Sequence, residues 1–155
     1  TDLPTGYRCF KLYFDGLLPA TDGAILYLRT STDNGVSFTA SAGAYAWTND
    51  GNNSTAGQAG GGNASDTEIE IAADHGNVAG EDAAGTITIH NPRNASGYTR
   101  ANWEISYLNS AATAQHDGRN GGGNRNAAED NDAFQLVFST GNIATMNWTL
   151  IGVRA

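Results

Sequence analysis

Residues 133–153, AFQLVFSTGNIATMNWTLIGV, contain two stretches of alternating apolar and polar residues on either side of a Ser-Thr-Gly-Asn segment. Strand side chains point alternately to two faces, so this alternation predicts two β-strands. Gly141 and Asn142 tolerate the positive φ of a tight reversal, and the stretch is therefore predicted to form a β-hairpin. The residues expected on its buried side are Phe134, Leu136, Phe138, Trp148 and Leu150.

The same period of two recurs along the chain. It predicts further strands at residues 7–14, 24–31, 36–41, 68–72, 85–91 and 98–108. A tight turn at 32–35 separates the second from the third, because Asn34-Gly35 readily adopts the two positive φ values of a type I′ hairpin. The inward residues predicted for these strands are Phe10, Leu12, Phe14, Leu26, Leu28, Ile69, Ile71, Ile87, Ile89, Trp103 and Ile105.

Two long segments contain almost nothing that could be buried. Residues 49–66 and about 110–132 are rich in Gly, Asn, Ser and Asp, and we expect them to be exposed, mobile loops. The glycine runs 60–62 and 121–123 lack the Lys-Ser/Thr ending of a phosphate-binding loop, so they are interpreted as flexible linkers.

About eight short strands, few helix signals and two long Gly/Asn-rich loops predict an all-β fold, an antiparallel β-sandwich that is jelly-roll-like. The 155 residues suit one domain spanning 1–155, with residues 1–6 as an extended arm or linker. The chain begins with Thr rather than Met, so we expect processing, trimming or a longer parent chain.

Composition limits the partners. The formal net charge is -8 and Lys11 is the only lysine, so phosphate backbones and anionic lipids would be repelled. No apolar run approaches the roughly 20 residues of a membrane-spanning helix. We therefore expect no nucleic-acid partner and no membrane insertion. Cys9 is the only cysteine, so the chain can form neither an intramolecular disulfide nor a cysteine-based metal site.

A catalytic triad was considered around the three histidines, His75, His90 and His116. Asp74 and Asp117 are adjacent to two of them in sequence, but no Gly-x-Ser-x-Gly motif is present. We expect solvated loop histidines and no enzymatic activity. The serines considered as nucleophiles are Ser96, Ser106 and Ser110, and the carboxylates expected to face solvent on strands are Glu68, Glu70 and Glu104.

Acidic clusters are the weak candidate for a metal. Glu129, Asp130 and Asp132 could supply oxygen ligands to Ca²⁺, as could Glu81 with Asp82. No Asp-x-Asx-x-Asx-Gly loop appears, so we expect solvated charges, no bound metal and no cofactor.

Aromatic residues beside Asn- and Asp-rich segments are typical of sugar-binding surfaces, and also of faces where subunits pack. Those expected to point outward or lie in loops are Tyr13, Tyr27, Tyr45, Trp47 and Tyr98, and we favour subunit contact for them. The candidate ligand-binding residues are Tyr45, Trp47, Asn49, Asp50, Tyr98, His116, Asp117 and Arg119.

Both ends of the chain resemble phage and prophage virion proteins of the tail-fibre or minor-tail type. In the C-terminal stretch the matching residues are Phe138, Ser139, Gly141, Asn142, Ile143, Ala144, Leu150 and Gly152, while Met146 replaces a glycine and Ile151 an aromatic. In the N-terminal part the matches are Pro19, Thr21 or Asp22, Gly23, Leu26, Leu28, Ser31, Thr32, Gly35 and Phe38, followed by Tyr45.

The resemblance implies a non-enzymatic structural protein on the surface of a tailed-phage virion, the knob of a tail fibre or a minor tail protein, that binds a host receptor or glycan. It also implies self-association, usually as a trimer, and contact with other virion proteins. A capsid or filament decoration (cement) protein, with residues 1–7 as a docking arm, is the alternative. A free carbohydrate-binding module or a small hydrolase is weaker.

Overall fold

The computed structural model describes residues 2–55, 57–111 and 113–154, with Ala59 described by its backbone only. These residues contain ten strands and no helix, and none of their segments is a helix long and apolar enough to cross a membrane. The strands are β1 (Tyr7–Pro19), β2 (Ala24–Ser31), β3 (Tyr45–Asn53), β4 (Gly57–Asp66), β5 (Ile69–His75), β6 (Ala83–His90), β7 (Tyr98–Leu108), β8 (His116–Ala128), β9 (Ala133–Phe138) and β10 (Ile143–Arg154).

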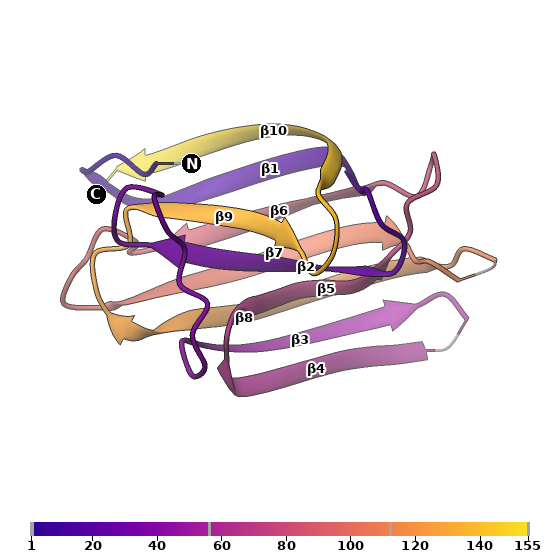
Figure 1. Cartoon of the computed structure of the whole chain (residues 1–155), viewed down its shortest axis with the longest axis horizontal. Coiled ribbons are helices and arrows are strands. Elements are labelled where there is room, and N and C mark those ends of the chain that lie inside the picture. The colour runs from indigo at the N-terminus through magenta and orange to yellow at the C-terminus, as the bar shows by residue number, and fades with distance from the viewer. Residues whose placement is uncertain (1, 56, 112, 155) are drawn as a thin grey trace.

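The strands form two antiparallel sheets, one of seven strands in the order β10-β1-β6-β7-β8-β3-β4 and one of three in the order β5-β2-β9 (Figure 1). The small sheet lies over one face of the large one, and the apolar side chains of both sheets form one cluster between them. The predicted all-β antiparallel sandwich is confirmed. The strand order does not confirm the jelly-roll arrangement.

Alternation of side chains determines the core. In β7 the odd-numbered residues from Thr99 to Tyr107 are buried, and the even-numbered residues from Tyr98 to Ser106 are exposed. Because inward side chains of both sheets meet face to face, each strand contributes every second residue to the interior. All the inward residues predicted for strands at 7–14, 24–31, 68–72, 85–91 and 98–108 are buried.

The hairpin predicted for 133–153 is wrong in its pairing, although both strands exist and Gly141 has φ +70°. β9 pairs with β2 and β10 pairs with β1, so the turn carries the chain from one sheet to the other. The apolar faces of the two strands thus meet the same core from opposite layers. Phe134 and Phe138 are buried as predicted and Leu136 is half-buried, but Trp148 is 53% exposed and Leu150 half-buried at an outer edge.

The two polar segments predicted as mobile loops are largely strands. Residues 49–66 complete β3 and form β4, and residues 110–132 contain β8. Several glycines of these strands occupy positions where a Cβ would clash with a side chain or carbonyl group of a neighbouring strand. A Cβ on Gly121 would lie 2.5 Å from the Thr48 carbonyl oxygen and 2.7 Å from Cε2 of Trp103. Glycine at this strand position therefore allows the large Trp103 ring into the core.

The turn after β2 has the predicted backbone, with φ +59° at Asn34 and +78° at Gly35. The strand predicted at 36–41 is absent, and Val36 is 85% exposed. Side chains satisfy the backbone donors here, because the Asp33 carboxylate accepts from both N–H and Oγ of Ser37. These hydrogen bonds, with one from the Ser31 hydroxyl, lower the pKa of Asp33 to about 2.

The N-terminal residues that the structure describes are docked rather than free. Asp2 forms an isolated antiparallel bridge with Ala133, and the Leu3 N–H donates to the Asp132 carbonyl at 2.6 Å. Leu3 is 3% exposed and belongs to the core cluster. These two residues are therefore packed against the domain.

Candidate functional site

The outer face of the seven-stranded sheet carries polar side chains in rows across β7, β8 and β3. The register places Glu104 beside Asn120 and Asn120 beside Asp50. The next row toward the start of β8 contains Ser106, Gly118 and Asn52. Adjacent strands lie about 4.8 Å apart, so the first row presents three side-chain groups at a regular spacing and the second presents two, on either side of Gly118.

Glycines on β8 make the middle of this face hollow. Gly118 and Gly122 occupy outward positions of β8, so no side chain stands there between the side chains of β7 and β3. A Cβ on Gly118 would meet nothing within 4 Å. The depression at Gly118 has a volume of about 630 Å³, and the next one, at Gly122, about 470 Å³. We call these two adjoining depressions the β8 groove.

The β8 groove offers hydrogen-bonding chemistry of several kinds. Asp50 and Glu104 provide carboxylate acceptors, and Asn52 and Asn120 provide amides that both donate and accept. The Ser106 hydroxyl and Nε2 of His116 lie 2.8 Å apart and are hydrogen-bonded. These side chains are exposed and stand on paired strands, so they are accessible and held in fixed relative positions.

Of the eight candidate ligand-binding residues, Asp50, Trp47, His116 and Arg119 line the β8 groove, and of these only Asp50 and His116 have outward positions. Asn49 and Asp117 are buried on the inner side, where Asn49 Oδ1 accepts from the Gly61 N–H and Asp117 Oδ2 accepts from the Asn109 amide at 3.4 Å. Arg119 is half-buried on the same side as Asp117. A shift of one residue along a strand changes the face that a side chain occupies, which explains these differences.

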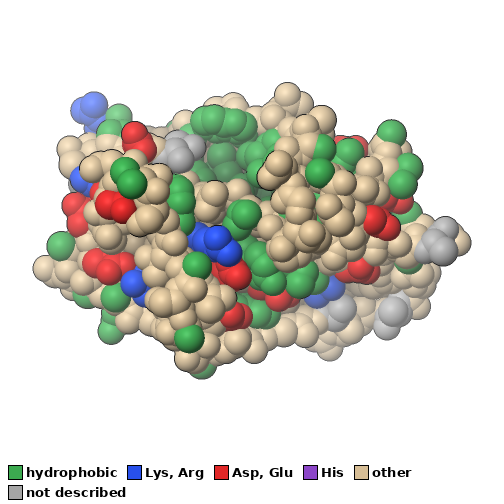
Figure 2. Space-filling model, in the orientation of Figure 1, with side chains coloured by type: hydrophobic (Ala, Val, Ile, Leu, Met, Phe, Trp, Pro, Cys, Tyr) green, Lys and Arg blue, Asp and Glu red, His purple; other side chains and the backbone are tan. Residues whose placement is uncertain are grey.

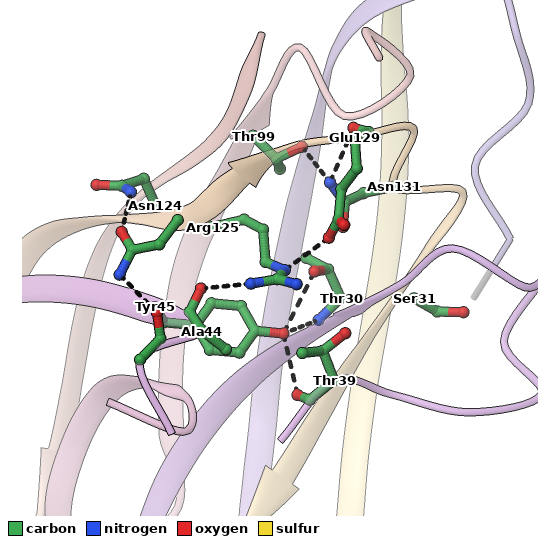
Figure 3. A network of polar contacts seen from close by, with 12 residues as sticks. Thr30, Ser31, Thr39, Ala44, Tyr45, Thr99, Asn124, Arg125, Glu129 and Asn131 are labelled. Carbon is green, nitrogen blue, oxygen red and sulfur yellow. Dashed lines mark hydrogen bonds and ion pairs between the residues drawn. The ribbon is translucent and has the colours of Figure 1, made fainter. Parts of the chain in front are cut away.

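Tyr45 was expected outward and is instead fully buried. Its hydroxyl accepts from the Thr30 N–H at 2.9 Å and donates to the Thr39 carbonyl at 3.1 Å (Figure 3). The Arg125 guanidinium lies 5.4 Å from the ring centroid and donates to the Ala44 carbonyl. Tyr45 thus ties β3 of the large sheet to β2 of the small one and offers no surface to a ligand.

Of the remaining aromatic candidates, Trp47 lines the depression at Gly122 and the others lie outside the β8 groove. Trp47 is half-buried and its Nε1 donates to Asp66 at 2.8 Å, while Tyr98 is 52% exposed at the start of β7 and does not line the groove. Tyr13 is exposed as expected, and Tyr27 is half-buried. The polar groove residues that the sequence did not indicate as site residues are Asn52, Thr86, Glu104, Ser106 and Asn120 at the Gly118 depression, and Thr48, Asn63, Arg100, Asn102 and Asn124 at the Gly122 depression.

The catalytic groups that were considered do not assemble as one triad. Ser106 meets His116, but Asp117 points to the opposite face of β8. Ser110 donates instead to Asp74. His75 is fully buried against Tyr107, and desolvation, with a smaller effect of the Arg119 charge, lowers its pKa to about 3.

The acidic cluster near the end of β8 is paired with arginines. Glu129 accepts from Arg125 at 2.6 Å, and Asp130 and Asp132 lie 3.2 Å and 3.8 Å from Arg93. Glu81 accepts from the Val78 N–H. Among the residues described, no three His, Cys, Asp or Glu side chains form a group that could hold a metal ion.

Comparison of the chain with protein-family models, curated proteins and solved structures yields no match. The chemistry of the β8 groove and the resemblance of both ends of the chain are therefore what indicate a function.

Proposed function

We propose that this protein is a non-enzymatic binding module on the surface of a tailed-phage virion, the knob of a tail fibre or a minor tail protein, and that it binds a host-surface glycan in the β8 groove. The observation that carries the binding part is the row of Asp50, Asn120 and Glu104 beside a floor made by Gly118. The virion part depends on the resemblance of residues 26–38 and 134–153.

A glycan suits the groove because hydroxyl groups occur along the whole sugar chain, and each can donate and accept hydrogen bonds. Carboxylates and amides of the β8 groove complement such hydroxyls. The two depressions adjoin along one strand and open to solvent, which favours an extended chain over a small enclosed molecule. The net charge of -8 favours neutral or amino sugars over acidic ones.

The binding proposal is tested with an array of immobilised polysaccharides, followed by titration of any polysaccharide that binds. Gly118→Phe should abolish the binding, because its ring would fill the depression. Asp50→Asn and Glu104→Gln should each weaken it about tenfold, the size of one charge-assisted hydrogen bond. Thr149→Phe, an equally bulky change on the outer face of β10, is the matched control and should bind normally. Silence of the whole array, or normal binding by Gly118→Phe, would contradict the proposal.

A second candidate is a capsid or filament decoration protein, and an exposed apolar patch on the outer face of β1 and β10 favours it. Tyr13, Ile151 and Val153 are 41%, 48% and 49% exposed there, and such patches are common where subunits pack. The same patch supports self-association, which we propose to be trimeric. An ordered lattice on a purified particle with no glycan binding would favour this candidate. Absence of the chain from purified particles would leave only a free carbohydrate-binding module.

A further inference from the structure

An apolar hollow of about 440 Å³ opens between the two sheets on the side where each sheet ends. β9 is the last strand of the small sheet and β10 the last of the large one, so the outer edges of these two strands border the hollow. Figure 2 shows hydrophobic side chains gathered in a depression on this face. Its apolar lining consists of Leu12, Phe38, Phe134, Leu136, Ile143, Met146 and Trp148.

The hollow leaves part of the core uncovered. Leu136, Ile143 and Met146 pack against the core cluster but remain half-buried, and Trp148 is 53% exposed. Away from the hollow, Phe138 of β9 is covered and only 4% exposed. Apolar surface concentrated in a concave place marks a binding surface.

The free edge of β9 already begins an antiparallel pairing. Asp2 lies opposite Ala133, and the Leu3 N–H donates to the Asp132 carbonyl. In an antiparallel ladder each step back along one strand is a step forward along the other. A strand continuing along β9 beyond this bridge would lie opposite Leu136 and Phe138 in turn. It would run over the hollow between β9 and β10.

We propose that this hollow is a strand-acceptor site, filled by an extended peptide segment that pairs antiparallel with the free edge of β9 and becomes the fourth strand of the small sheet. The segment has apolar side chains at alternate positions, because residues opposite each other in a sheet share a face. Positions opposite Leu136 and Phe138 would therefore point into the hollow. This inference is independent of glycan binding.

A peptide strand fits better than a lipid chain because the site has two requirements. The lining needs apolar cover, and the edge of β9 presents main-chain N–H and C=O groups that β2 does not reach. Ser139 donates its N–H to Ile25 of β2, so in a regular ladder the amides of Leu136 and Phe138 point to the free edge. Strand addition satisfies both requirements at once.

The test presents a strand of known sequence at the start of the chain, where attachment gives it a high effective concentration. One variant carries Ser-Val-Thr-Val-Thr directly before Thr1, which places both valines opposite Leu136 and Phe138. The matched control carries Val-Thr-Val-Thr-Ser, which has the same composition but directs its valines away from the hollow. Amide hydrogen exchange of β9 and the mass in solution are measured for both variants and for the unextended chain.

We expect exchange at the Leu136 amide to slow at least tenfold in the first variant and to stay unchanged in the control, with both variants keeping the oligomeric state of the unextended chain. Equal exchange in both variants, whether fast or slow, would overturn the proposal. Protection of β9 in the unextended chain that increases with protein concentration would assign the hollow to a second copy and would also overturn it.

Discussion

Replacement of His75 by Phe is expected to raise the free energy of unfolding by about 1–3 kcal/mol at pH 7. His75 is fully buried, and neither ring nitrogen has a hydrogen-bond partner among the residues described. Its ring stacks on Tyr107 with centroids 4.1 Å apart and meets the edge of Phe138 at 5.4 Å. A phenyl ring keeps these contacts and removes the two unsatisfied polar atoms.

The same residue should make the protein acid-sensitive. Burial lowers the pKa of His75 from 6.5 to about 3, so between these values the unfolded chain binds a proton that the folded chain does not. Protonation of His75 in the unfolded chain therefore leaves the free energy of unfolding unchanged above pH 6.5 and lowers it progressively as the pH falls from 6.5 toward 3. The loss should reach about 2 kcal/mol by about pH 5, before most carboxylates titrate.

Urea unfolding at pH 7 and at about pH 5 measures both effects. Phe at position 75 should stabilise the protein and remove this part of its pH dependence. His75→Ala should also remove that pH dependence but should lower the stability by about 2–4 kcal/mol, because it leaves a cavity. A His75→Phe protein that keeps the full pH dependence would show that another group is responsible.

Gly121→Ala is expected to cost about 3 kcal/mol, the upper part of the range for overpacking a filled core. The new methyl group would meet the Thr48 carbonyl on one side and the Trp103 indole on the other. The Thr48 carbonyl belongs to the backbone of a paired strand, so it cannot move aside as a side chain could. Gly118→Ala is the matched control, three residues earlier on β8 and pointing outward. A Cβ there meets nothing within 4 Å, so no loss of stability is expected.

Thermal and urea unfolding of the two alanine variants give the comparison. Equal stability of the two would mean that β8 can shift away from Trp103, and that glycine is not required at position 121. Trp103→Phe combined with Gly121→Ala should recover part of the loss, since the smaller ring gives back some of the space.

The sequence was informative where one face of a strand is apolar and the other polar. The bounds of β2 and β7 agree with the prediction, because Leu26 and Leu28, or Trp103 and Ile105, stand out among polar neighbours. In β4 and β8 glycine and asparagine occupy both faces. Their strand conformation depends on distant partners such as Trp47 and Trp103, which no local pattern reveals.

The pairing of β9 and β10 was missed for a related reason. A turn signal such as Ser139–Asn142 indicates a reversal, but it does not distinguish a hairpin from a crossing between layers. In the candidate site, Asp50 and His116 were found because they are polar residues near glycines. Asn120 and Glu104 gained their significance only from the register that aligns them with Asp50.

The groups of the β8 groove stand on hydrogen-bonded strands rather than on loops, and this affects how its specificity could change. Exchange of one outward side chain alters a single contact point and leaves the positions of the others unchanged. Variants with new ligand preferences could thus arise one substitution at a time.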